Sequence, residues 1–342
     1  MKFLLFCFMF ILAHCQQNQK ENSDNQTITL GNLFVEASLA ATANVCAVDS
    51  ASNMSHFTTD TVPSGYSVSV RRVYTTLSDG NRSEVYYPND TRANLPVLIV
   101  FPGGNVHGSF YSRLAAGLAS SGYVVYIPYR CSVFFFQYFL VPSIDLPSIV
   151  FSDANAQNSN SGDLQNRIDT SSLGLIGHSL GGVIGLFSMN GICEFPFCDS
   201  APNSLTQVKA GVFYGSGLGT SYSSDRYKTT NGVGIPVAYV QGSLDSAFTP
   251  TDAEENFANV PSPSYLYTVE GANHYGITDS NNPVVANPET NDSTLAQDSA
   301  ILAISNLTVL FMDAYLKNDA TSLSSIQSGS TGIANVTLAS SK

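Results

Sequence analysis

Basic and charged residues are scarce in this chain of 342 residues. Lysine and arginine number 14 against 26 aspartates and glutamates, a net charge of −12 that leaves no basic surface for a phosphate backbone. Charged residues make up only 12% of the sequence, about half the usual share in soluble proteins. This balance argues against nucleic-acid binding and is typical of an exported protein.

Signatures of metal and nucleotide sites are also missing. The sequence contains no Walker loop, no H-E-x-x-H and no C-x-x-C, so we expect neither a metal nor a cofactor. The glycines of 215–219 resemble a dinucleotide loop, but Thr220 stands where its last glycine would be and no separate βαβ unit begins there. We therefore reject cofactor binding at this loop.

The N-terminus has the pattern of an export signal. Lys2 precedes an apolar run over 3–13, 11 residues long, which is too short to cross a bilayer of ~20 helical residues. We predict a signal peptide over 1–15, a polar segment over 16–60, and no transmembrane span. Leu12 to Cys15 resembles a lipoprotein signal except for His14, so ordinary cleavage and a lipid anchor at Cys15 are both open. Either route predicts a secreted or extracytoplasmic protein.

Four cysteines follow the signal segment. Cys193 and Cys198 are close enough in sequence to form a disulfide readily, which would leave Cys46 with Cys131; four free thiols are the alternative. Asparagine acceptors for N-glycosylation occur at Asn25, Asn53, Asn81, Asn89, Asn291, Asn306 and Asn335. These features fit a secreted glycoprotein.

The central part of the chain alternates apolar runs with amphipathic segments, which predicts an α/β fold with a mostly parallel sheet and helices on both faces. We expect the first two strands to be antiparallel because polar residues alternate along them. The predicted strands cover 67–77, 84–87, 97–101, 123–129, 173–176, 210–214, 237–241 and 265–269, and the helices 110–120, 180–189, 252–258 and 295–316. Beyond the domain at 61–317, the Ser/Thr-rich residues 318–342 predict a flexible tail.

A strand that runs directly into a helix carries the most informative motif. The stretch 173–182 reads Leu-Gly-Leu-Ile-Gly-His-Ser-Leu-Gly-Gly, an apolar strand followed by G-x-S-x-G. In this context the motif indicates a nucleophile elbow, in which a sharp turn presents the hydroxyl of Ser179 at the sheet edge. The helix behind it offers backbone N–H groups and a partial positive charge. The alternative is a structural glycine turn.

A nucleophilic serine needs a base, and the chain has only five histidines. His274 alone follows the serine, in a loop after a predicted strand, whereas the side chain of His178 should point away from Ser179. A carboxylate must orient the imidazole, and Asp245 at the end of strand 237–241 fits best. The competing acids are Asp225 in a polar loop, and Asp252, Glu254 and Glu255 on a predicted helix.

Two N–H donors are needed for an oxyanion that forms at the serine. One is the residue after it, Leu180. The other we place in the glycine-rich loop after strand 97–101, at Gly104, with Asn105 in reserve; a simple tight turn is the alternative.

Together these residues resemble the α/β-hydrolase superfamily, in the branch of chlorophyllases, cutinase-like polyester hydrolases and platelet-activating-factor acetylhydrolases. The resemblance covers about 67–316 and rests on the segments 102–104, 120–125 and 168–170, the elbow at 177–182, Asp245, and the loop 272–274. It implies hydrolysis of small or polymeric carboxylic esters through an acyl-enzyme, without a cofactor. The apolar segment 133–151 departs from the family pattern and is either a pocket lining or buried packing.

Two other functions stay open. An acyltransferase would use the same triad with an alcohol or amine acceptor, and a hydrolase-like binding module would carry out no chemistry.

Overall fold

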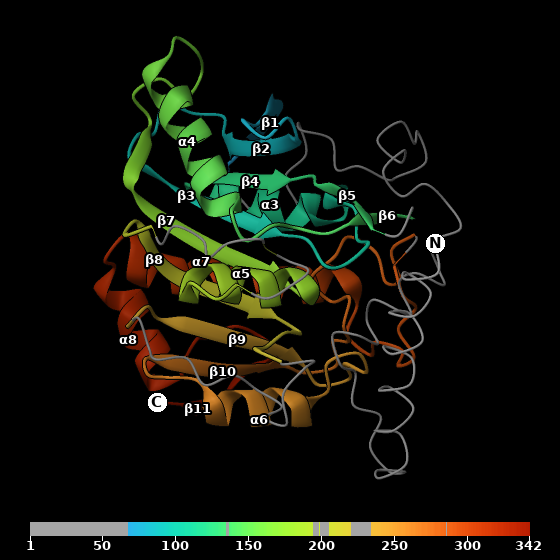
Figure 1. Cartoon of the computed structure of the whole chain (residues 1–342). Helices are drawn as coiled ribbons and strands as arrows, with labels where there is room; N and C mark the ends of the chain where they lie inside the picture. The colour runs from blue at the N-terminus through green and yellow to red at the C-terminus, as the bar shows by residue number, and fades with distance from the viewer. Residues whose placement is uncertain (1–67, 135–136, 194–197, 199–204, 220–233, 285) are drawn as a thin grey trace, which may run out of the picture.

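The computed structural model describes residues 68–134, 137–193, 198, 205–219, 234–284 and 286–342. The predicted signal peptide at 1–15, the segment 16–60, Cys15, Cys46, Asp225 and the acceptors Asn25 and Asn53 lie outside the described residues. Within this part the fold is α/β, as the sequence predicts: one nine-stranded sheet with helices on both faces (Figure 1).

The sheet has the strand order β1-β2-β4-β3-β7-β8-β9-β10-β11. From β4 to β10 all neighbours are parallel, whereas β1 pairs antiparallel with β2, β2 with β4, and β11 with β10. The antiparallel start is confirmed. The strands are β1 (Val70–Thr76), β2 (Arg82–Pro88), β3 (Leu95–Phe101), β4 (Val124–Pro128), β7 (Ile168–His178), β8 (Val208–Tyr214), β9 (Val237–Gly242), β10 (Ser264–Val269) and β11 (Val336–Ser341).

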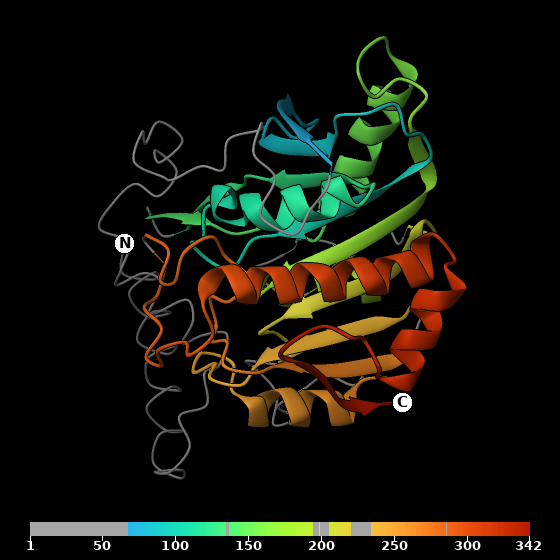
Figure 2. The same ribbon diagram turned by 180° about the vertical axis from the view of Figure 1, so that it is seen from behind.

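Helices cover the two faces of the sheet and bury two separate apolar clusters. One face carries α4 (Leu146–Ser159), α5 (Leu180–Asn190) and α6 (Pro250–Asn259). The opposite face carries α3 (Ser112–Ser120), after the short helix η2 (Gly108–Tyr111), and α7 (Gln297–Leu316) (Figure 2). Because the central strands are apolar on both sides, as in the fully buried β3, they require this double cover.

The connections change direction at the centre of the sheet. From β3 the chain passes through α3 to β4, toward one edge, whereas from β7 it passes through α5 to β8, toward the other. The carboxyl ends of the neighbours β3 and β7 therefore form the switch point where open α/β sheets bind ligands. The predicted oxyanion loop and the predicted elbow follow these two strands.

The apolar segment 133–151 folds as a hairpin and the start of a helix. Strands β5 (Cys131–Phe134) and β6 (Gln137–Leu140) pair with each other, and α4 follows. Sequence reasoning named neither the hairpin nor α4, because the segment shows no clear period. It packs in part as core, since Ile144 and Val150 are fully buried.

The flexible tail predicted for 318–342 is wrong. Residues Ala320–Ser328 form α8, and β11 adds an antiparallel strand to β10. Its few apolar residues are used: Ile326 is fully buried and Val336 nearly so. The side chain of Asp319 also caps α8 by accepting from the N–H of Ser322 at 2.7 Å. The Ser/Thr-rich composition predicted disorder because it does not show that a few apolar residues are buried and that β11 pairs with β10.

Helix α7 confirms the predicted apolar helix at 295–316. The helix is long and apolar enough to cross a bilayer, yet 61% of its most apolar 18-residue stretch is buried inside the protein. Leu307 and Phe311 are fully buried against the sheet. This packing is that of a core helix.

Cysteine pairing agrees with the prediction where it can be followed. Cys193 and Cys198 form a disulfide with their Cα atoms 5.6 Å apart. Cys131 is also disulfide-bonded.

The contact between α5 and β3 generates the first prediction. A Cβ atom on Gly181 would lie 2.2 Å from the carbonyl oxygen of Phe101 and 2.3 Å from that of Pro102. Both obstacles are backbone, so Gly181→Ala must displace α5 from β3. We expect the free energy of unfolding, measured by urea denaturation, to fall by about 1–3 kcal/mol.

Gly162→Ala is the matched control, because a Cβ there meets nothing within 4 Å. Equal stability of the two variants would contradict the tight approach at Gly181.

Candidate active site

Ser179 occupies the sharp turn between β7 and α5. Its φ of 52° and ψ of −127° place a non-glycine residue in a strained region of the backbone. The serine is partly exposed, whereas its neighbours His178 and Leu180 are buried. Strain at a single exposed hydroxyl on a strand-to-helix turn is the backbone feature that a nucleophile elbow requires.

Glycines on both sides of Ser179 make the turn possible. A Cβ on Gly177 would lie 2.4 Å from the Cα of Gly182, and a Cβ on Gly182 would lie 2.4 Å from the Oγ of Ser216. Strand β7, helix α5 and the loop after β8 therefore meet without space for a side chain. These two contacts explain the positions of Gly177 and Gly182 in the G-x-S-x-G-G sequence.

The loop after β8 fixes the backbone of Ser179. The Ser179 N–H donates to the carbonyl of Tyr214 at 3.0 Å, and the hydroxyl of Ser216 donates to the Ser179 carbonyl at 2.8 Å. Gly215, between these two partners, has a φ of 53°. The glycine-rich stretch 215–219, which resembles a nucleotide loop, thus begins as a support for the elbow.

Asp245 and His274 form a buried pair. The Nδ1 atom of His274 lies 2.9 Å from Oδ2 and 3.0 Å from Oδ1 of Asp245. The carboxylate also accepts from the N–H groups of Ala247 at 2.9 Å and Phe248 at 2.8 Å, which fix its position at the end of β9. The structure brings together the two residues that the sequence predicts as acid and base.

The pair lies over Gly215, next to the backbone of Ser179. A Cβ on Gly215 would be 2.7 Å from Oδ2 of Asp245 and 3.0 Å from Nδ1 of His274. Tyr214 and Ser216, on either side of Gly215, both bond to the backbone of Ser179, so the Asp245–His274 pair lies close to the main chain of the predicted nucleophile. Among the described residues Ser179 Oγ has no hydrogen-bond partner, and it therefore makes no hydrogen bond to His274 in this structure.

The loop after β3 leaves one N–H free beside Leu180. Gly103 donates to the hydroxyl of Tyr111 at 2.8 Å, and Asn105 donates to the carbonyl of Leu140 at 2.9 Å. Within the described ranges, the N–H groups of Gly104 and Leu180 have no partner. A Cβ on Gly104 would lie 3.1 Å from Cδ2 of Leu180, so the two residues are adjacent. Asn105, the reserve donor, is therefore already engaged.

His178 connects the loop after β3 with the loop that carries His274. Its Nε2 lies 2.9 Å from the His274 carbonyl, which can only accept, so Nε2 carries the proton. Nδ1 then accepts from the Tyr111 hydroxyl at 2.7 Å, whose oxygen accepts from Gly103. Burial, and then the charge of His274, hold the pKa of His178 well below its ordinary value, in agreement with this neutral ring.

Glu289 is a second carboxylate at the site that sequence reasoning did not find. It accepts from the backbone N–H of His274 at 3.0 Å and from the hydroxyl of Ser246, the residue after Asp245. Although burial opposes it, these hydrogen bonds lower the pKa of Glu289, so the group is charged. Glu289 follows His274 in the chain, whereas the search was confined to acids between Ser179 and His274.

The two carboxylates act on the same imidazole. Burial acts to lower the pKa of His274, but the charge and hydrogen bond of Asp245, together with the charge of Glu289, raise it above 6.5. The result is a buried base that holds its proton more tightly than free imidazole does.

The other candidate acids have structural roles or remain untested. Asp252 forms a capping box with Thr249 at the start of α6, and Glu254 is exposed. Asp279, a further acid after His274, accepts from Ser112 and Arg113 at the start of α3. Burial raises its pKa to about 7 despite these bonds.

Comparison with known proteins adds no family assignment. No model of a known protein family matches the chain. No curated protein matches it either.

Removal of the Tyr111 hydroxyl tests the connection through His178. Tyr111→Phe leaves the Gly103 N–H without its acceptor and His178 without its donor. For the ester hydrolysis that the sequence predicts, we expect kcat to fall about tenfold or more, with a smaller change in KM, because small displacements at a reacting centre are costly.

Tyr123→Phe is the control for the loss of a buried hydroxyl. The Tyr123 hydroxyl donates to Asp313 at 2.5 Å and contacts none of the site residues named above. The Tyr123→Phe variant should therefore be less stable but keep its kcat. Equal kcat values for the two variants would mean that the connection has no effect on the reaction.

Glu289→Gln tests the second carboxylate through the pH profile. The base must be unprotonated to act, so kcat/KM falls as the pH drops through the pKa of His274. Glutamine keeps an acceptor for the His274 N–H but removes the charge that raises this pKa. We expect the acid limb to move to lower pH by a fraction of a unit to about one unit.

Asp292→Asn removes the same charge from an exposed position of the same loop and should leave the profile in place. An unchanged limb in Glu289→Gln would exclude an electrostatic role.

Proposed function

We propose that this chain is a serine hydrolase that cleaves carboxylic esters and has the α/β-hydrolase fold. The observation that carries the proposal is the strained, partly exposed Ser179 beside a buried Asp245–His274 pair. The mostly parallel sheet with helices on both faces, and the chain order serine, aspartate, histidine, support the same assignment.

In the proposed mechanism Ser179 Oγ attacks the ester carbonyl while His274 Nε2 takes its proton. His274 then gives this proton to the leaving alcohol, which departs as the carbon–oxygen bond breaks and the acyl-enzyme forms. Water attacks the acyl-enzyme in the second half, again with His274 as base, and releases the acid. Asp245 holds the imidazole through Nδ1 and stabilises its cation.

The oxyanion is assigned to the N–H groups of Leu180 and Gly104. Both are free among the described residues, and Leu180 is at the N-terminus of α5, where the helix dipole favours negative charge. The N–H groups on either side of Gly104 are fixed by other bonds, which holds the loop ready before substrate arrives. Loss of one such donor costs about 10² to 10³ in kcat.

The reaction needs no metal or cofactor in this proposal. Extracytoplasmic placement is supported by the disulfide between Cys193 and Cys198, since such bonds persist in oxidising compartments. A lipid anchor at Cys15 remains the alternative to a freely secreted chain.

The test is the hydrolysis of p-nitrophenyl esters with labelling by a fluorophosphonate. We expect the wild type to turn over and to be labelled, and Ser179→Ala to lose the label and about 10⁴-fold or more in kcat. Ser159→Ala, an exposed serine at the end of α4, should behave as the wild type.

Turnover and labelling that survive in Ser179→Ala would remove Ser179 from the mechanism. A wild type that neither labels nor hydrolyses any ester would favour the binding module. Product partition between water and an added alcohol separates a hydrolase from an acyltransferase.

A further inference from the structure

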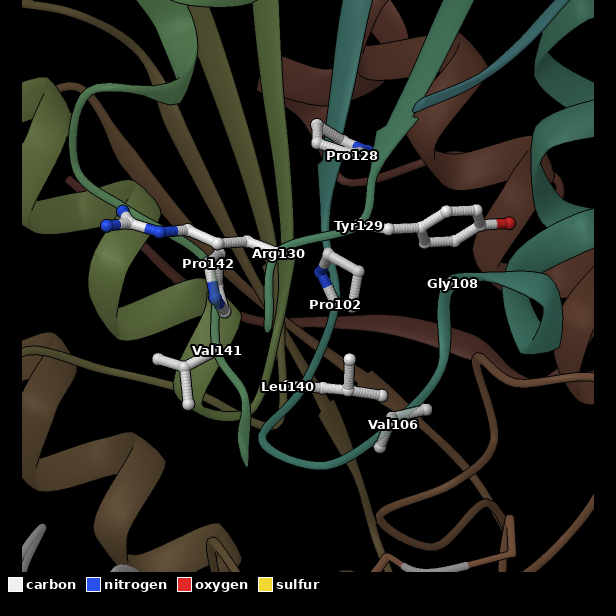
Figure 3. A pocket seen from close by; sticks show the side chains of 9 residues that line it. All are labelled: Pro102, Val106, Gly108, Pro128, Tyr129, Arg130, Leu140, Val141 and Pro142. Atoms are coloured by element: carbon white, nitrogen blue, oxygen red, sulfur yellow. The ribbon is translucent and has the colours of Figure 1, made fainter. Parts of the chain in front are cut away.

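A pocket opens beside the proposed oxyanion loop (Figure 3). Pro102 and Val106, which flank the segment 103–105, form one side of it, and Leu140, Val141 and Pro142 form another. The backbone N–H of Leu140 also bonds to the Asn105 side chain at 3.2 Å. The pocket wall and the oxyanion loop are therefore parts of one hydrogen-bonded unit.

Arg130 is the charged residue that lines this otherwise mainly apolar pocket. Its side chain is partly buried, and among the described residues its guanidinium has no ion pair, hydrogen bond or ring partner. In Figure 3 it leaves the backbone in the direction opposite to Tyr129 and extends past Pro142. A partly desolvated cation without a partner is costly unless an anion joins it.

The other described arginines do not share this property. Each has an acidic or aromatic partner, although the protein carries a net charge of −12 and offers acids freely. The partners are Asp163 for Arg71, Glu84 for Arg72, the Tyr74 ring for Arg82, Asp90 for Arg92 and Arg167, and Asp298 for Arg113. Among the described arginines, Arg130 is therefore the one whose guanidinium is available to an anionic ligand.

The backbone around Arg130 is held in place. Its carbonyl accepts from Val141 at 3.3 Å, and the next residue, Cys131, is disulfide-bonded. On the other side the Tyr129 ring stacks on His107 at 4.6 Å, and its hydroxyl donates to the buried Glu84. The base of the arginine is thus fixed before any ligand binds, which lowers the entropy that binding must remove.

We propose that the substrate is an ester with an anionic arm, whose carboxylate binds Arg130 and whose carbon chain lies against the apolar wall. This inference rests on the proposed function. The planar guanidinium can bind a carboxylate through two parallel hydrogen bonds.

The first test compares p-nitrophenyl hemiglutarate with its neutral counterpart, p-nitrophenyl pentanoate. We expect the ratio of their kcat/KM values to fall about tenfold to a hundredfold in Arg130→Gln. Arg130→Lys should recover part of the ratio. Arg71→Gln, which removes a charge paired with Asp163, is the control for long-range attraction of anions.

A second pair of esters shows which side of the substrate carries the anion. The acetate ester of 4-hydroxybenzoate bears the charge on the alcohol part, and phenyl acetate is its neutral counterpart. Sensitivity to Arg130→Gln in this pair alone would place the alcohol part in the pocket, and sensitivity only with hemiglutarate would place the acyl part there.

Ratios unchanged by Arg130→Gln in both pairs, with neutral esters hydrolysed normally, would overturn the anion pocket and leave the esterase proposal intact. Thermal unfolding with added monomethyl glutarate tests the pocket without turnover. Stabilisation of the wild type but not of Arg130→Gln supports the pocket even if no ester is cleaved, and equal shifts in the two proteins contradict it.

Discussion

The meeting of three backbone segments at Ser179 is the constraint on which the site depends. Strand β7, helix α5 and the loop after β8 approach so closely that Gly177 and Gly182 touch through their main chains. The turn can form only where β7 ends. The hydrogen bond from the Ser179 N–H to the Tyr214 carbonyl and the one from the Ser216 hydroxyl to the Ser179 carbonyl then hold Ser179 in a backbone conformation that it would not adopt alone. Packing of the sheet and helices supplies the free energy that compensates this strain.

Electrostatics at the site is organised around one buried imidazole. Asp245 contacts the ring of His274, and Glu289 contacts its backbone N–H. The His274 carbonyl in turn accepts a hydrogen bond from Nε2 of His178. Among the described residues, the backbone N–H, the carbonyl and Nδ1 of His274 thus each have a hydrogen-bond partner. Only Nε2, the atom that would face Ser179, has none. Such a network fixes ring orientation as well as charge.

Most of the fold and the central residues of the site could be predicted because their signals are local. The apolar runs of β3 and β8 and the glycine spacing around Ser179 depend on neighbours in the sequence. Asp245 and His274 were found because each follows a strand, and the carboxyl ends of parallel strands meet at one edge. Their meeting over Gly215 agrees with that reasoning.

What could not be predicted depends on contacts between distant segments. Tyr111 and Glu289 have no motif, and their importance appears only when η2 and the loop after His274 come together with the elbow. The tail was misread for the same reason, since a strand with only two or three apolar residues forms when β10 offers it an edge. The composition of residues 318–342 reflects their many polar residues, but it does not show that β10 is available to pair with them.

The position of β11 bears on solubility. Without it β10 would present a row of unpaired N–H and C=O groups, and a regular strand of that kind invites pairing with another molecule and aggregation. Strand β11 forms the edge of the sheet in place of β10 and ends in Ser340 and Ser341, which Lys342 follows. The opposite edge strand, β1, carries Arg71 and Arg72. Polar and charged residues thus lie on both edge strands of a sheet whose interior is almost wholly apolar, and they disfavour pairing with another molecule.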